Sequence, residues 1–196
     1  MQKKVLNEYL NLLDSQREAI FTKISGIETS ILWQKPAEKE WSMGENIDHG
    51  RMLLKSFRRL LTILWPVFMP YARLKRHRHY EVYIDDVYER PGFPLNVGWM
   101  FPSKFNTDNP VSLEHLSELY INEHLALRKF YENKQEDLLG NLNVYDPAIG
   151  WINLIQALRV GIHHDEHHFR QVRKLYGERD QTFKTSRPLS FSFKPI

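Results

Sequence analysis

The sequence predicts an all-α protein, a four-helix bundle with a long crossover between its second and third helices. Apolar residues recur at three- and four-residue spacing in four separate segments, a pattern typical of amphipathic helices. Residues 70–110 have no sustained periodicity and separate the second segment from the third. Because 196 residues with 42% apolar content can bury one substantial core, we expect residues 1–196 to form a single domain.

The first two helices are indicated by their apolar repeats and by one capping motif. The first helix is expected over residues 5–27. Ser42 and Glu45 then form an S-x-x-E capping box, in which a hydroxyl and a carboxylate satisfy free backbone donors at a helix start. The second helix should follow this box and cover residues 43–67, because prolines disturb its apolar pattern beyond that point.

The crossover and the last two helices complete the predicted bundle. Residues 70–110 are rich in aromatic and turn-forming residues, and a connection of this length is often a lid or a binding element. The third helix is expected over residues 112–134 and the fourth over residues 151–176, with Gly177 as the C-cap of the fourth. Residues 178–196 have no helical pattern, so we expect an extended or loosely docked tail.

The composition excludes several classes of function. The chain has no cysteine, which excludes disulfides, thiolate zinc sites and a cysteine nucleophile. Its 27 basic residues are nearly matched by 24 acidic ones, and this balance does not favour a nucleic-acid partner. The most apolar run, Leu60–Ala72, is too short to span a bilayer, and the chain begins without the apolar stretch of a secretory signal. We therefore expect a cytoplasmic protein that does not enter the membrane.

The chemistry of the chain is concentrated in the predicted fourth helix, where four of the nine histidines lie between residues 163 and 168. Two pairs, each four residues apart, are available, and such a pair can direct two imidazoles at one ion. At ~100° per residue, His164 and His168 border the apolar face of the helix, whereas His163 and His167 lie roughly opposite it. We therefore expect His164 and His168 to face the core.

A third ligand has to come from another helix, because two histidines are one short of a stable catalytic site. His49 borders the apolar stripe of the second helix and fits this role. Asp165 and Gln171 are candidates to hydrogen-bond the ligating imidazoles, and Asp165 is also the candidate carboxylate for acid or base assistance. Three histidines leave coordination positions open for water or substrate, which is the catalytic pattern.

The alternative interpretation is structural, since a histidine beside an apolar stripe is often a satisfied core residue. For His124 we expect core packing or a hydrogen bond rather than ligation. His163 and His167 are expected at the surface, and the remaining histidines, His77, His79 and His115, in solvent.

Two motifs of the chain are typical of a known family. Trp41, Ser42, Glu45 and His49 form a W-S-x-x-E-x-x-x-H motif at the opening of the second helix. Downstream, the sequences PAIG and HDEHHFRQ form a P-x-x-G turn and an H-x-x-x-H-x-x-Q helix. These motifs resemble those of the DinB/YfiT-like metalloprotein superfamily. The helix count, the long crossover and the order of the motifs agree with that superfamily over residues 1–176.

The resemblance implies an up-down-down-up bundle with a divalent transition metal on three histidines, which map onto His49, His164 and His168. Zinc or nickel is favoured, while iron, manganese and copper stay open because imidazole suits them too. The resemblance also implies a small-molecule substrate, with a low-molecular-weight thiol as one candidate. Independently of the resemblance, a homodimer through a face of the bundle is a candidate partner. The aromatic segment 70–110 departs from the simplest pattern of the family.

The leading hypothesis is an enzyme in which the metal activates a thiol or a water, with thiol S-transfer preferred over hydrolysis. The alternative is a non-enzymatic metal-binding or stress-response protein. Nucleic-acid binding through the basic residues near Lys55 and Arg73 is disfavoured, because a solvated basic face explains them.

Overall fold

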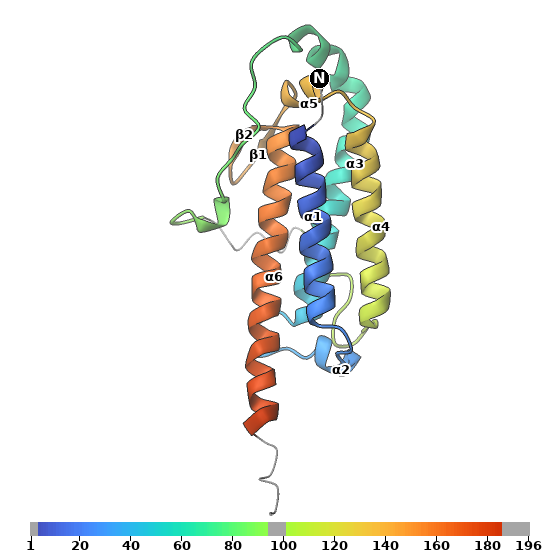
Figure 1. Ribbon diagram of the computed structural model, residues 1–196, viewed down its shortest axis with the longest axis vertical. Helices are drawn as coiled ribbons and strands as arrows, with labels where there is room; N and C mark the ends of the chain where they lie inside the picture. Colours follow the sequence, from blue (N-terminus) through green and yellow to red (C-terminus); the bar gives the residue numbers. More distant parts are fainter. Residues whose placement is uncertain (1–3, 94–100, 186–196) are drawn as a thin grey trace, which may run out of the picture.

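The computed structural model describes residues 4–93 and 101–185, except for the side chains of residues 179–185. Four long helices form the bundle in Figure 1: α1 (Lys4–Lys23), α3 (Met43–Lys75), α4 (Leu113–Glu132) and α6 (Leu154–Thr185). In that view α1 and α6 run in one direction, and α3 and α4 run in the other. This confirms the all-α, up-down-down-up bundle. Because α3 and α4 are parallel, the chain must return along the bundle between them, which explains the long crossover.

Short elements connect the long helices. They are α2 (Thr29–Leu32), the 3-10 turn η1 (Val87–Glu89), α5 (Glu136–Gly140) and an antiparallel hairpin of β1 (Asn143–Asp146) and β2 (Gly150–Asn153). The hairpin was not predicted, since the fourth helix was expected to begin at residue 151. Gly150, at φ +97°, ends the turn in a backbone conformation that glycine favours, and Val144 pairs with Ile152 across the hairpin.

Helix α6 begins three residues later than predicted because a second capping box fixes its start. The Oδ1 atom of Asn153 accepts hydrogen bonds from the amides of Ile155 (3.0 Å) and Gln156 (2.9 Å). In return the amide of Asn153 donates to Oε1 of Gln156 at 3.1 Å. This is the same reciprocal arrangement as in the Ser42–Glu45 box, built from the amide side chains of Asn and Gln.

Helix α3 extends past its predicted end at residue 67 and contains Pro66 and Pro70 in its interior. Each proline removes one helical hydrogen bond, but the segment beyond them still has packing partners. Ala72 is fully buried, and the Arg76 guanidinium next to the helix end pairs with Asp137 of α5 at 2.9 Å. Tertiary contacts of this kind offset the lost hydrogen bonds.

The predicted ends of the first and last helices were also wrong. Helix α1 ends at Lys23 rather than at residue 27, because Gly26 turns the chain at φ +76°. Helix α6 continues through Gly177 to Thr185, so residues 178–185 of the predicted tail are helical. The glycine costs some helix stability but leaves the helical hydrogen-bond pattern available. The rest of the predicted tail, residues 186–196, lies outside the described residues.

The core is formed by apolar side chains from all four long helices, such as Leu13, Ile47, Tyr120 and Phe169. Trp33 closes one end, where its indole N–H donates to the carbonyl of Val111 at 2.7 Å. Over the described part of the chain, no helix is long and apolar enough to cross a membrane.

Candidate metal centre

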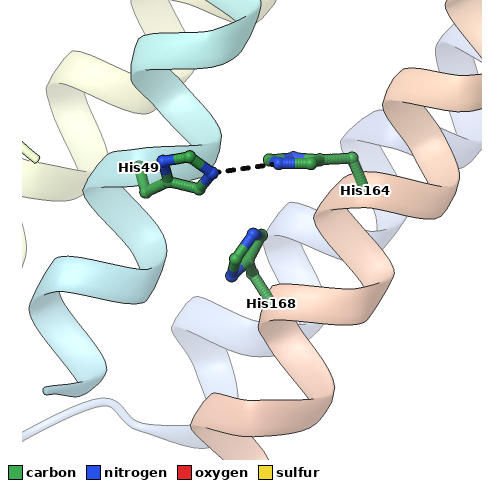
Figure 2. Close-up of side chains that lie close together, drawn as sticks. All are labelled: His49, His164 and His168. Atoms are coloured by element: carbon green, nitrogen blue, oxygen red, sulfur yellow. Dashed lines mark hydrogen bonds between the residues drawn. The ribbon is translucent and has the colours of Figure 1, made fainter. Parts of the chain in front are cut away.

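The capping box that starts α3 also sets the direction of His49. The amide of Ser42 donates to Oε2 of Glu45 at 2.8 Å, and the amide of Glu45 donates to Oγ of Ser42 at 3.1 Å. His49 follows one helical turn later and faces α6, where His164 and His168 lie one turn apart. Figure 2 shows the three rings pointing toward one another from these two helices. All three are buried.

The ring nitrogens are close enough to share one ion. One nitrogen of each of the three histidines lies within 4.8 Å of the others. The Nε2 atoms of His49 and His164 are 3.1 Å apart, the contact drawn as a dashed line in Figure 2. Two nitrogens bound to one tetrahedral ion at ~2.0–2.1 Å each would lie roughly 3.3 Å apart. The spacing therefore fits a shared divalent ion.

The second nitrogen of each ring faces an oxygen atom. Nδ1 of His49 donates to the carbonyl of Phe101 at 2.6 Å, and Nδ1 of His168 donates to Oδ1 of Asn46 at 3.0 Å. Nδ1 of His164 lies 3.8 Å from Oδ1 of Asp165. When Nδ1 carries the proton, Nε2 keeps its lone pair free for a metal. Outer contacts of this type orient ligating imidazoles in metalloproteins.

Two groups on α3 hold these oxygen atoms in place. The amide of Asn46 donates to the carbonyl of Ser42 at 2.9 Å, which directs its own oxygen at His168. Asp48 is fully buried and accepts from the amide of Lys104 at 2.6 Å and from the hydroxyl of Ser103 at 2.9 Å. These bonds tie the end of the crossover to α3 and so position the Phe101 carbonyl beside His49.

Asp165 lies behind His164 in the centre of the bundle, with no exposed surface. Its Oδ2 atom is 3.6 Å from Nε2 of His124 on α4. Gly50 makes room for this arrangement, since a Cβ there would lie 2.8 Å from the Tyr120 hydroxyl and 3.1 Å from Oδ1 of Asp165. Three helices therefore meet around one carboxylate.

His124 connects this carboxylate to the outer side of the bundle. Its Nδ1 atom lies 3.2 Å from Oδ1 of Asp14, which also binds Arg17 (2.7 Å) and Arg128. Burial lowers the pKa of His124, but the neighbouring carboxylates Asp14 and Asp165 raise it, and the net shift is upward. The prediction that His124 packs and hydrogen-bonds in the core is confirmed.

Burial favours the neutral form of His49 and His168. It lowers the pKa of His49 to about 4, helped by the adjacent His164, and it lowers the pKa of His168 well below its ordinary value. Burial raises the pKa of Asp165, but the neighbouring His124 and His164 lower it by more. The net shift of this pKa is downward, so the carboxylate stays ionised. Neutral imidazoles next to a buried carboxylate form a donor set suited to a divalent cation.

The structure brings together the pair on α6 that the helical phase selected, but it corrects the environment of the other pair. His163 was expected at the surface and is 8% exposed, with Nδ1 at 3.7 Å from Asp86. His167 is half-buried and stacks on Tyr88 with ring centroids 5.0 Å apart. Both predictions failed because the crossover packs on this face of α6. The histidines expected in solvent, His77, His79 and His115, are exposed.

Gln171 is exposed, and its supporting role beside the histidines stays a prediction. A contact of this kind that the sequence did not predict is the hydrogen bond between Asn46 and His168. The sequence motif contains Trp41 but did not predict its contacts: its ring centroid lies 4.7 Å from that of His49 and 5.8 Å from that of His168. The spacing of Asn46, three residues before His49, was the available signal, because such residues share a helix face.

A cavity of about 450 Å³ lies beside the histidines, between α3, α6 and the β hairpin. His49, His164 and His168 are part of its wall, and Tyr88 and Phe101 of the crossover line it as well. The site therefore combines a candidate ion position with space for a small molecule. A lid function for the crossover stays a prediction.

The fold and the site together define a class, four-helix bundles with a long crossover and an inward-facing histidine triad. No protein-family model matches the chain, and no curated protein matches it. Among solved structures the chain resembles YfiT from Bacillus subtilis, described as "a probable metal-dependent hydrolase with an unusual four-helix bundle topology". The two share 11% sequence identity at a TM-score of 0.57, over 92% of this chain and 90% of that chain. The protein thus has the YfiT-like fold that its motifs predicted.

Proposed function

We propose that the protein is a metal-dependent hydrolase whose ion is held by His49, His164 and His168. The observation that carries this proposal is the meeting of three buried imidazoles, with nitrogens within 4.8 Å of one another, at the wall of a 450 Å³ cavity. Three protein ligands leave a coordination position for water or substrate, as catalytic sites require. Zinc and nickel are the favoured ions, and iron, manganese and copper fit the same ligands.

When bound, such an ion acts as a Lewis acid and lowers the pKa of a water ligand toward neutrality. The chain would contribute the rest of the chemistry. The Phe101 carbonyl and the Asn46 amide hold two imidazoles in the correct tautomer. Asp165 would orient His164 and balance part of the positive charge from behind. Trp41 covers the rings of His49 and His168 and limits access of bulk water.

Hydrolysis is preferred here over thiol S-transfer for two reasons. The structural neighbour YfiT is described as a probable hydrolase. In addition, the described lining of the cavity holds no lysine or arginine that could pair with the carboxylates of a thiol such as glutathione. S-transfer from a low-molecular-weight thiol remains the alternative, because the same ligands would also bind a thiolate.

The experiment is a comparison of both reactions with one protein sample. Zinc- and nickel-loaded protein is assayed against a panel of esters and amides, and against an electrophile in the presence of glutathione, bacillithiol or mycothiol. The proposal expects metal-dependent ester or amide hydrolysis that is lost in His49→Ala and retained in the control His115→Ala. Turnover of thiols alone would support the S-transferase. No turnover at full metal occupancy would indicate a non-enzymatic metal-binding or stress-response protein.

We also propose a homodimer that pairs the outer face of α3. Ile63, Val67, Tyr71 and Leu74 follow one another at helical spacing on that face, and between 48% and 85% of each is exposed. An uncharged stripe of this kind can pack against its own copy across a two-fold axis. A cytoplasmic location stays a prediction of the sequence.

A further inference from the structure

The cavity beside the histidines follows α3 and α6 over several helical turns. Its wall on α3 extends from His49 to Leu64, and its wall on α6 extends from His168 back to Ala157. At 1.5 Å per residue these stretches are ~22 Å and ~17 Å long. The histidines line one end. Leu60 lies one helical turn before the other end and is 53% exposed, so this part of the wall reaches solvent.

Small residues on α6 create this space. Gly161 lines the cavity, and a Cβ placed there would meet Leu54 at 3.5 Å, an ordinary van der Waals distance. Ala157 and Val160 line the same wall. A larger side chain at position 161 would therefore fit the backbone and occupy the cavity.

The lining of the cavity is apolar away from the histidines. The helices contribute leucines, a phenylalanine and small residues, and the hairpin contributes Val144, Ile149 and Ile152. Asp146 is the one ionisable residue of the described lining other than tyrosine and histidine. Its carboxylate accepts the amides of Ala148 (2.8 Å) and Ile149 (3.0 Å) within its own turn. A charged ligand would lose its hydration here without gaining an opposite charge.

We infer that the substrate is a neutral, elongated, apolar molecule whose chain lies between α3 and α6 and whose reacting group reaches the histidine end. The identity of the reacting group rests on the proposed hydrolase function, whereas the binding of a neutral apolar chain is independent of that function. The substrate class is therefore an ester or amide of a long alkyl or arylalkyl group, whose apolar chain matches the apolar part of the lining.

The test measures binding rather than turnover. Hexan-1-ol, octan-1-ol, octanoate and glutathione are titrated into metal-free protein by calorimetry, because a bound ion would itself offer a coordination position to a carboxylate or a thiol. Because each buried methylene contributes ~0.8 kcal/mol, octanol should bind roughly 15-fold more tightly than hexanol. Octanoate should bind at least roughly ten-fold more weakly than octanol, because its carboxylate has no cationic partner. Equal affinities along the chain-length series, or octanoate or glutathione binding as tightly as octanol, would overturn the inference.

Variants locate the binding. Gly161→Leu should fill the cavity and weaken octanol binding roughly ten-fold or more, since the blocked space would otherwise bury several methylenes. Gly177→Leu is the matched control, because the same change in the same helix meets no atom within 4 Å and lies outside the lining. If Gly161→Leu fails to fold by circular dichroism, Val160→Phe replaces it. Unchanged affinity in a folded cavity variant contradicts the inference, whereas octanol binding without hydrolysis counts only against the proposed function.

Discussion

Asp165 is the residue on which the surroundings of the histidine triad converge. Its carboxylate is fully buried between His164, His124 and Tyr120, which come from two helices. A buried charge in such a position is costly unless its partners compensate it. Here the compensation comes from imidazoles on both sides, one of them a candidate ligand. The carboxylate therefore couples the metal centre to the packing of the core.

Replacing Asp165 by asparagine should weaken metal binding without removing a ligand. The substitution keeps the shape but removes the negative charge behind His164, so we expect a loss of roughly ten- to a hundred-fold in metal affinity. Competition with a chromophoric chelator measures it. The control is Glu166→Gln on the outward side of the same helix, where the carboxylate pairs with Arg170 and Arg173. Equal losses in the two variants would contradict the role of Asp165.

The metal-free protein should be sensitive to mild acid. In the folded chain the pKa of His49 is about 4, because burial and the adjacent His164 lower it from 6.5. Between these values the unfolded chain binds more protons, so the free energy of unfolding falls as the pH decreases from about 6.5 through about 4. Asp14 and Asp165 have pKa values lowered from 3.8 and do not lose their contribution in this window.

Urea unfolding at pH 7, 6 and 5 measures this effect. In His49→Phe the free energy of unfolding should depend less steeply on pH than in wild type, because the substitution removes one imidazole whose pKa is lowered by folding. The pKa of His168 is also lowered, so His168 preserves part of the pH dependence in this variant. The raised pKa of His124 acts with opposite sign, since its contribution is full below about 6.5 and is lost as the pH rises. Wild-type stability that does not change between pH 7 and pH 5 would contradict the account.

At the scale of single residues, the helical phase was enough to predict which histidine pair faces inward. The apolar periodicity of α6 shows which face of the helix points to the core. His164 and His168 lie next to this face, and their histidine neighbours do not. It could not predict that His163 is buried, because that depends on where the crossover packs. The Phe101 carbonyl was equally out of reach, because a backbone oxygen 52 residues away leaves no trace in side-chain patterns.

At the scale of elements, α6 is the helix on which the site depends most. The Asn153–Gln156 box fixes its first turn and thus the height at which the histidines face α3. The sequence contains this box as N-x-x-Q. It was not predicted as the helix start because the hairpin directly before it was not predicted either. The expected C-cap at Gly177 failed for a different reason, because a glycine that ends one helix can be tolerated inside another.

The continuation of α6 through Gly177 leads to a prediction with a definite sign. Gly177→Ala should stabilise the protein by ~1 kcal/mol, because alanine is favoured in a helix interior and its Cβ would meet no atom within 4 Å. The free energy of unfolding in urea measures it. Gly150→Ala is the opposing control and should destabilise, since Gly150 has a φ of +97°. Destabilisation by Gly177→Ala would indicate that the glycine ends the helix after all.

At the scale of the whole molecule, the parallel α3 and α4 are the feature that gives the site its shape. The crossover they require returns along the bundle, and its described residues Tyr88, Phe93 and Phe101 line the cavity. The order of helices and the crossover were predictable from four periodic segments and one gap. The hairpin that completes the cavity was not predictable, because strands of four residues are too short to show a clear alternating pattern beside the periodicity of the following helix.

The proposed dimer belongs to this scale as well. Wild-type protein should sediment as a dimer, and Ile63→Lys should shift it to the monomer, because a lysine within the paired apolar stripe on α3 would be buried without a partner. The control is Thr62→Lys, one residue away on a different side of the helix. A monomeric wild type, or a dimer unaffected by Ile63→Lys, would contradict the pairing through α3.

The central claim is that His49, His164 and His168 hold one divalent ion, and elemental analysis of protein purified without a histidine tag tests it most directly. We expect about one ion per chain in wild type and in the controls His115→Ala and His167→Ala. His49→Ala, His164→Ala and His168→Ala, each folded by circular dichroism, should lose most of it. Equal metal content in all six proteins, or loss of metal in His167→Ala but not in His164→Ala, would contradict the claim.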